Sequence, residues 1–177
     1  MGNALRRALW AQSDRGPWFA LLATALFGAV QVVGHIDHEP WKDELHCYGV
    51  GRSASGLMDL LTGERRYEGH PFMWYLLLHL ASRVHRDWIT LPVVATAVVT
   101  LAAYVWLRYA RVPRLLRVAI LGSYYLLYEY GVLSRSYTLG MLLVFVFCAL
   151  YHPLRIRYVA SGFVLFLIAA TSLYGTL

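Results

Sequence analysis

The chain has 177 residues, of which 59% are hydrophobic, and it carries a formal net charge of +6. Its mean hydropathy is +0.50. Apolar residues make up only roughly half of an ordinary soluble domain, so the composition excludes a typical soluble protein and favours one whose solvent is the lipid bilayer. The arginines are scattered between apolar segments and form no basic stripe. Membrane topology therefore explains the positive charge better than nucleic-acid binding does.

Five apolar segments are predicted to cross the membrane as helices. A helix needs about 20 apolar residues, or as few as about 17, to span the hydrocarbon core. The segments are residues 18–34, 88–107, 115–130, 137–151 and 159–173. The first follows several arginines without a small-residue cleavage pattern, so we expect an uncleaved helix with its N-terminus in the cytoplasm. The sequence thus predicts a single all-α membrane module over residues 1–177.

A sixth apolar segment, residues 71–84, is too short to be assigned to a span on length alone. If it crosses, six of the sixteen Lys and Arg residues fall on the cytoplasmic side, against nine of sixteen if it lies in the interface. The positive-inside rule favours the interfacial arrangement. The same topology places nine of the ten carboxylates on the outer face, a bias that the rule does not require.

The long first external loop, residues 35–87, is predicted to contain two or three juxtamembrane helices. The first has Pro40 at its first position, carboxylates in its first turn, and an end near Arg52. The second has Ser55 as its cap and a short apolar set after it. A third opens at Pro71, where aromatic residues suited to the headgroup level follow.

Histidines and carboxylates crowd into the start of this loop. They are His35, Asp37, His38, Glu39, Asp43, Glu44 and His46. Imidazole and carboxylate suit several divalent ions, but no recognised ligand spacing is present. A solvated acidic surface is therefore the main interpretation, and a divalent cation site is the alternative. Because adjacent helix positions do not share a face, we expect only one of Asp43 and Glu44 to point into a site.

A second external loop contains Glu129 and Arg135. The segments on either side of it, 115–130 and 137–151, are short for a full span, which draws the loop towards membrane depth. Ionisable residues at that depth are functional candidates by default. A structural ion pair between Glu129 and Arg135, or exposure at the interface, is the alternative interpretation.

Three short motifs follow one another along the predicted external surface: residues 41–45 (Trp-Lys-Asp-Glu-Leu), 67–71 (Tyr-Glu-Gly-His-Pro) and 129–137 (Glu-Tyr-Gly-Val-Leu-Ser-Arg-Ser-Tyr). In order and side, they resemble the N-terminal module of membrane glycosyltransferases of the C-type (GT-C) fold, in the branch related to protein mannosyltransferases and aminoarabinose transferases. That family carries an Asp-Glu pair in the first external loop, a His-Pro motif that opens a juxtamembrane helix, and a later acidic residue or Arg-x-Tyr.

The chain departs from this family in three respects. Phe72 follows the His-Pro motif where many members have a second proline, and Glu129 stands where an aspartate is more usual. Family members also continue through several more helices and often a C-terminal extracytoplasmic domain. The resemblance therefore implies that this chain is a fragment or a reduced protein.

The resemblance implies a multi-pass transferase of the inner (plasma) membrane. It moves a sugar from a polyprenyl-phosphate donor to a lipid, glycan or protein acceptor on the extracytoplasmic face, and it needs no nucleotide cofactor. Such chemistry requires a base to take the acceptor proton. Asp43 is the expected base, with Glu44 as the alternate.

The remaining site residues are implied to bind substrates. Arg135 is expected to bind the donor phosphate, with Tyr137 beside it in the Arg-x-Tyr motif. His70 is expected to donate a hydrogen bond to phosphate or sugar, or to cap the interfacial helix. Glu129 is expected to orient the acceptor or to hold Arg135 in place.

Two non-enzymatic hypotheses compete with the transferase. The chain could bind or transport a lipid or a small solute, a function that broken helices often mark, although no predicted span is plainly interrupted by paired Gly and Pro. It could also be an inactive partner subunit, as its short length would allow.

Overall fold

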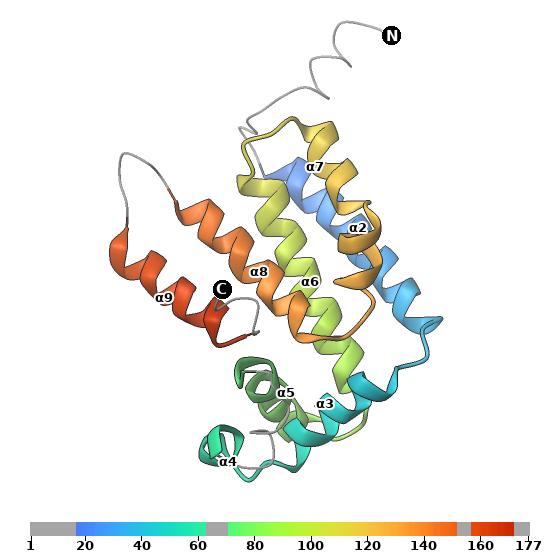
Figure 1. The fold of residues 1–177 in the computed structure, drawn as a ribbon. Helices are drawn as coiled ribbons and strands as arrows, with labels where there is room; N and C mark the ends of the chain where they lie inside the picture. The colour runs from blue at the N-terminus through green and yellow to red at the C-terminus, as the bar shows by residue number, and fades with distance from the viewer. Residues whose placement is uncertain (1–16, 63–70, 152–156, 172–177) are drawn as a thin grey trace, which may run out of the picture.

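The computed structural model describes residues 17–62, 71–151 and 157–171 (Figure 1). Within these ranges the chain forms helices and connecting turns and contains no strand, so the predicted all-α fold is confirmed there. In chain order the helices are α2 (Trp18–Ile36), α3 (Lys42–Ser53), α4 (Leu57–Thr62), α5 (Met73–Val84), α6 (Thr90–Tyr109), α7 (Arg114–Leu121), the π-helix η2 (Tyr125–Glu129), α8 (Ser136–Leu150) and α9 (Tyr158–Ala169).

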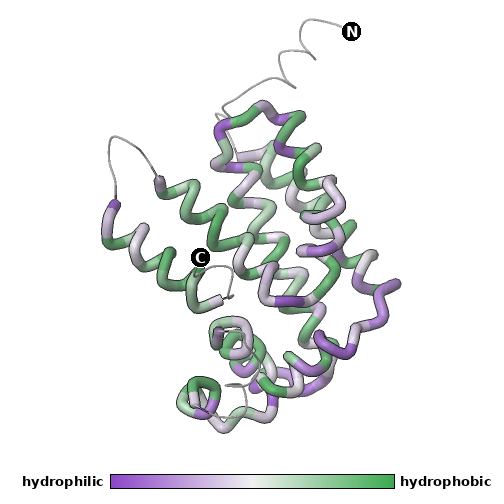
Figure 2. Tube along the Cα trace, in the orientation of Figure 1, coloured by the Kyte–Doolittle hydropathy of each residue, from purple (hydrophilic) through white to green (hydrophobic). Residues whose placement is uncertain are grey.

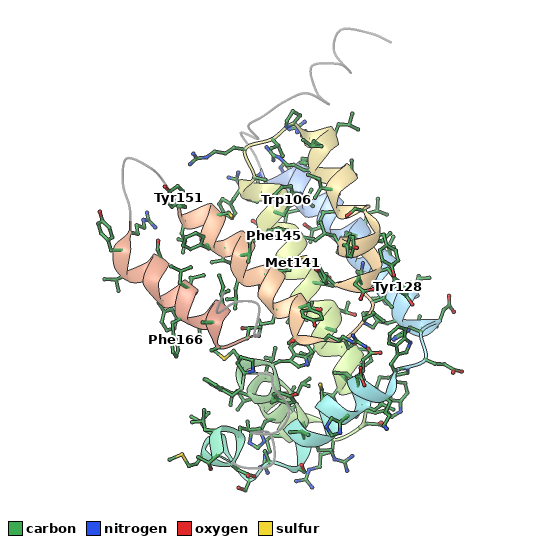
Figure 3. All side chains as sticks on the ribbon, in the orientation of Figure 1. Trp106, Tyr128, Met141, Phe145, Tyr151 and Phe166 are labelled. Carbon is green, nitrogen blue, oxygen red and sulfur yellow. The ribbon has the colours of Figure 1, made fainter. Side chains whose placement is uncertain are left out.

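Helix α6 is the centre of a bundle, with α2 and α8 packed against it and α9 packed against α8 (Figure 1). Its buried residues include Ala95, Ala102 and Ala103. Small side chains let neighbouring helices approach closely, which matters where lipid offers no hydrophobic force to drive helices together. Nearer the end of α6, Trp106 contacts Phe145 of α8 with ring centroids 5.0 Å apart (Figure 3).

Two helices are long and apolar enough to cross a membrane: α2, with 19 residues, and α6, with 20. Helix α2 is apolar over most of its length (Figure 2), and its exposed large side chains are apolar, with Leu22 70% and Leu26 69% exposed. A contiguous exposed apolar face of this kind is rare on a protein that is solvated by water alone. Helices α8 and α9 are apolar but shorter, with 15 and 12 residues. The expected total of five spans stays a prediction.

The span predicted over residues 115–130 is not one continuous helix. Helix α7 ends at Leu121, the chain turns at Gly122, and the π-helix η2 then begins at Tyr125. Glycine followed by serine has low helix propensity, and a π-helix moves the following hydrogen bonds out of register. The amide of Tyr130 accordingly donates to the carbonyl of Tyr125, 2.7 Å away.

Carbonyl groups around this break are satisfied by side chains from other helices. The buried Gln31 of α2 donates from Nε2 to the carbonyl of Leu127 at 2.9 Å. The hydroxyl of Thr138 donates to the carbonyl of Tyr130 at 2.7 Å. Buried backbone groups need such partners because water cannot reach them. These contacts fix the turn that leads into Arg135.

Helices α3, α4 and α5 lie together at one end of the bundle, where α3 and α4 pack on α5 and α5 packs on α6 (Figure 1). Buried Tyr48 donates from its hydroxyl to the carbonyl of Asp87 at 2.7 Å, which ties α3 to the start of α6. With 12 residues, α5 is about 18 Å long, too short for a hydrocarbon core of about 30 Å. This length is what the predicted interfacial arrangement of residues 71–84 requires.

A glycine substitution tests the packing of α2 against the break. A Cβ at Gly131 would lie 2.6 Å from Oε1 of Gln31 and would also meet the carbonyl of Leu127. We therefore expect Gly131→Ala to lower the free energy of unfolding by about 1–3 kcal/mol. Thermal unfolding in detergent, followed by circular dichroism, measures this change.

Gly162 in α9 is the matched control, because a Cβ there meets no atom within 4 Å. Gly162→Ala should leave stability unchanged or raise it by up to about 1 kcal/mol. Equal losses in the two variants would contradict the packing described here.

Candidate functional site

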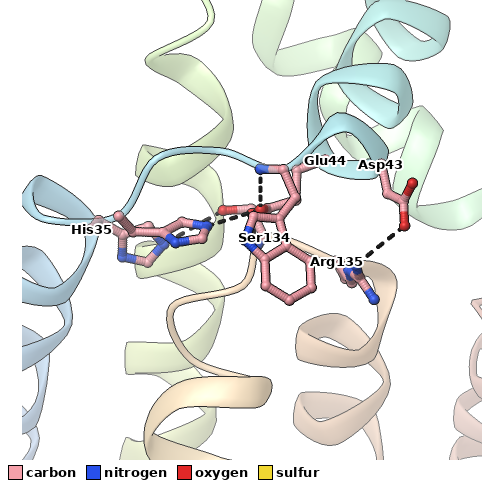
Figure 4. Close-up of polar contacts among 7 residues, drawn as sticks. His35, Asp43, Glu44, Ser134 and Arg135 are labelled. Atoms are coloured by element: carbon pink, nitrogen blue, oxygen red, sulfur yellow. Dashed lines mark hydrogen bonds and ion pairs between the residues drawn. The ribbon is translucent and has the colours of Figure 1, made fainter.

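The carboxylate of Glu44 joins two segments that are distant in the sequence, its own loop and the loop before α8. Its Oε1 accepts a hydrogen bond from the amide of Ser134 at 2.7 Å (Figure 4). Its Oε2 accepts from the amide of Trp41 at 2.8 Å and contacts Nε2 of His38 at 2.9 Å. The side chain is 1% exposed. A buried carboxylate is stable only with such a complete set of partners, so Glu44 locks the first external loop to the loop before α8.

The same contacts decide where α3 begins. Glu44 is the third residue of a helix that starts at Lys42, and it reaches back to the amide of Trp41 just before the helix. This is the carboxylate half of a capping box. The predicted start at Pro40 is therefore wrong by two residues, because the reaching glutamate selects Trp41 as the cap. The helix ends at Ser53, close to the predicted end at Arg52.

Histidines connect this carboxylate to the bundle. His35, at the end of α2, has Nδ1 2.9 Å from the carbonyl of Gln31 and 3.1 Å from the hydroxyl of Thr96 in α6. Its Nε2 lies 3.5 Å from the hydroxyl of Ser134 (Figure 4). Residues from α2, α6 and the loop before α8 thus converge on one polar network around Glu44.

The neighbouring carboxylate, Asp43, faces the opposite way and meets Arg135. Nη2 of Arg135 donates to Oδ2 of Asp43 at 3.2 Å (Figure 4). Asp43 remains 74% exposed in this pair, whereas Arg135 is 23% exposed. The guanidinium also lies over the ring of Trp41, 5.2 Å from its centroid, in a cation–π contact. Asp43 is therefore a carboxylate that is positioned by a cation and still open to an incoming molecule.

A pocket of about 180 Å³ opens beside this pair. It is lined by Asp43, His46, Cys47, Trp74, Tyr75, Arg135, Ser136 and Tyr137. Asp43 lies in the first turn of α3, and Ser136 and Tyr137 lie in the first turn of α8. Two helix N-termini, each with partial positive charge, therefore face the same space as the guanidinium, which favours an anionic ligand there.

Two buried donors among the pocket residues have no hydrogen-bond partner in the part of the chain that the structure describes. They are Nε1 of Trp74, whose side chain is 1% exposed, and Nε of Arg135. An unmade hydrogen bond in a buried place costs about 1–3 kcal/mol, so native proteins rarely leave one without a reason.

The structure brings together three of the six predicted site residues, because Asp43, Arg135 and Tyr137 line one pocket. Of the two adjacent carboxylates only Asp43 lines the pocket, and Glu44 is buried against the amide of Ser134. Glu129 does not line the pocket and accepts a hydrogen bond from Tyr124 at 3.2 Å. The partner of Arg135 is Asp43 and not Glu129, which corrects the alternative of a Glu129–Arg135 ion pair. His70 lies outside the described residues.

Sequence reasoning missed the roles of Ser134, Trp41 and Trp74. Ser134 acts through its backbone amide, which leaves no pattern in the side chains. Trp74 looked like an interfacial anchor because aromatic residues surround it in the sequence. His35 and His38 stood out only as part of a possible metal cluster, and within the described ranges no three His, Cys, Asp or Glu side chains are arranged to hold a metal ion.

Comparison with known proteins does not assign the chain to a family. No family model matches the chain, and no match was found among the curated proteins or the solved structures.

Substitution of each of the two adjacent carboxylates of α3 tests whether Glu44 stabilises the fold and Asp43 does not. Glu44→Ala removes the partner of the buried Ser134 amide, of the Trp41 amide and of His38, so we expect it to lower the free energy of unfolding by about 3–5 kcal/mol. Asp43→Ala removes one exposed ion pair and should cost no more than about 1 kcal/mol. Thermal unfolding of both variants in the same detergent measures these losses of stability. Similar losses in the two variants would contradict a structural role for Glu44 that Asp43 does not share.

Proposed function

We propose that the chain is the N-terminal module of a GT-C membrane glycosyltransferase. In this proposal it transfers a sugar from a polyprenyl-phosphate donor to an acceptor on the extracytoplasmic face of the plasma membrane, with its N-terminus in the cytoplasm. The observation that carries the proposal is the exposed Asp43 carboxylate held by Arg135 at the mouth of a pocket with unpartnered buried donors. These groups match what the reaction needs, namely a base and a phosphate-binding cation.

The proposed reaction assigns one step to each of these groups. The acceptor oxygen or nitrogen attacks the anomeric carbon of the donor sugar, and its proton passes to the carboxylate of Asp43. The bond between the anomeric carbon and the phosphate oxygen breaks, and its electrons stay with the lipid phosphate. The carboxylate suits this task because 74% of it is exposed and its position is fixed from one side only.

Arg135 stabilises the charge that develops on the leaving phosphate. Its guanidinium lines the pocket, with Nη2 bound to Asp43, and it remains 23% exposed in this pair. Two-point binding by a planar guanidinium is stronger and more directional than binding by an ammonium group. The N-terminus of α8 adds its partial positive charge at the same place.

Glu44 and its partners hold the two halves of the site together. Asp43 lies on the first external loop beside Glu44 itself, and Arg135 lies on the loop before α8 beside Ser134, whose amide the Glu44 carboxylate binds. Reacting groups must be held to within a fraction of an ångström for efficient catalysis, so a rigid buried link beneath the site is useful.

An apolar groove of about 610 Å³ offers a place for the lipid part of the donor. It runs between α2 and α6, where Val32, Ile36 and Val93 line it, and His35 and His38 of the Glu44 network lie at its polar end. A polyprenyl chain in this groove would stay in the hydrocarbon region while its phosphate approached the network.

A second candidate function is non-enzymatic binding or transport of a lipid or small solute. The observation that favours it is the break between α7 and η2, since interrupted helices often mark transport sites. An inactive partner subunit is a variant of this candidate. Transfer activity distinguishes these functions from a transferase, because a transporter binds the lipid without breaking the glycosidic bond.

The first test of the transferase is Asp43→Asn in the native membrane or in purified protein. The amide cannot accept the acceptor proton, so transfer from polyprenyl-phosphate sugars should fall by about 10²–10⁴-fold. Donor binding should stay within a few-fold of the unsubstituted protein. Transfer is measured with a panel of radiolabelled polyprenyl-phosphate sugars, and Asp59→Asn, an acidic residue of α4 outside the pocket, is the control. A normal rate in the Asp43 variant would rule out the base assignment.

The second test is Arg135→Lys, which keeps the charge and removes the planar fork. We expect transfer to fall by about tenfold or more, with weaker binding of the donor, because an ammonium cannot make the two-point contact. Donor affinity is measured by competition with polyprenyl phosphate. Arg83→Lys, at the far end of α5, is the matched control. If the lysine variant binds and transfers normally, phosphate is not recognised by this guanidinium.

A further inference from the structure

A second pocket, of about 490 Å³, lies at the opposite end of the bundle from the Asp43–Arg135 pair. Helix α8 begins beside the first site and ends at this pocket, and α6 also ends there (Figure 3). Its lining includes three arginines, Arg108, Arg111 and Arg117, and the aromatic residues Trp106 and Tyr151. Arginines and aromatic side chains together are typical of the headgroup level of a membrane.

One of the three arginines is used to close the end of α6. Arg117 is 1% exposed, and it donates from Nε to the carbonyl of Val112 at 2.8 Å and from Nη1 to the carbonyl of Leu107 at 2.7 Å. Trp106 donates from its ring to the carbonyl of Arg117 at 3.0 Å. The negative end of the α6 dipole is thereby neutralised from within the protein.

The other two arginines are left for a ligand. Within the described residues, no carboxylate forms an ion pair with Arg108 or Arg111. Arg108 lies over the ring of Tyr109, 5.6 Å from its centroid. Arg108 is half-buried against the pocket wall, and Arg111 is exposed at its rim. Two guanidinium groups without a carboxylate, beside aromatic rings, can bind a phosphate through charge-assisted hydrogen bonds.

An apolar surface continues from this pocket towards the middle of the bundle. Leu101 lies one turn before Val105 on α6, and Val144 lies one turn before Cys148 on α8, and the later residue of each pair lines the pocket. Leu101 is 51% exposed and Val144 is 44% exposed. Residues four positions apart share a helix face, so both apolar side chains lie below the arginines on the same side. A free phosphate ion would make no use of this surface, whereas an acyl chain would cover it.

We propose that this pocket binds the phosphate of an anionic phospholipid through Arg108 and Arg111, with an acyl chain along the exposed faces of α6 and α8. The site is distinct from the transferase site and does not depend on the proposed function. Its arginines belong to the end of the bundle that the positive-inside rule assigns to the cytoplasm, where anionic lipids are abundant.

Binding of fluorescent phosphatidylglycerol to the full chain in detergent tests this assignment. The combined variant Arg108→Gln and Arg111→Gln should bind the lipid about tenfold more weakly. The matched control, Arg114→Gln with Arg157→Gln, removes two charges from the same end of the bundle outside the pocket lining and should change binding by less than about twofold. The variant Arg108→Lys with Arg111→Lys should fall between these two.

Unlabelled lipids and inorganic phosphate, used as competitors on the unsubstituted chain, provide a test that does not depend on folding of the variants. Phosphatidylglycerol should displace the probe far better than phosphatidylcholine or inorganic phosphate. Equal competition by phosphatidylcholine would overturn recognition of the anion, and equal competition by inorganic phosphate would identify a site for soluble phosphate. An equal loss of affinity in the control variant would reduce the effect to general surface charge and would also overturn the proposal.

Discussion

The arrangement of the first site depends on one buried carboxylate. Glu44 has no access to water, and each of its oxygens is bound by groups from a different part of the chain. Because a charge in such a place is stable only when all its partners are present, the external loop and the loop before α8 can take only one relative position. Asp43 is the neighbour of Glu44, and Arg135 is the neighbour of Ser134, so the same link brings the two residues to their 3.2 Å contact.

Helix α6 connects the Glu44 network to the opposite end of the bundle. It carries Thr96, which contacts His35 of the Glu44 network, and in its last turn it carries Leu107, whose carbonyl accepts a hydrogen bond from Arg117. Polar groups are therefore concentrated at the two ends of the bundle, and the helices between them are packed through small and apolar residues. This division is expected of a chain whose middle lies in hydrocarbon and whose ends meet headgroups and water. It also explains why each pocket with arginine in its lining lies at an end.

The break between α7 and η2 has two consequences for the fold. It shortens the helical path into Arg135, so the loop before α8 lies where Glu44 can reach its backbone. It also exposes carbonyl groups that Gln31 and Thr138 must satisfy from other helices. Gln31 is a polar residue in the most apolar part of α2, and this contact gives the reason for its presence. The same interruption is the observation that supports transport as the second candidate function.

The sequence by itself determined the all-α class, the two long apolar helices and the short length of the apolar run at residues 71–84. These follow from composition and from runs of apolar residues, which are local or additive properties. Only the tertiary structure decided that Glu44 is buried while Asp43 faces the pocket, that Arg135 binds Asp43 and not Glu129, and that residues 115–130 are broken. The physical reason is that adjacent helix residues point about 100° apart, so which one meets a distant backbone amide depends on how whole helices pack.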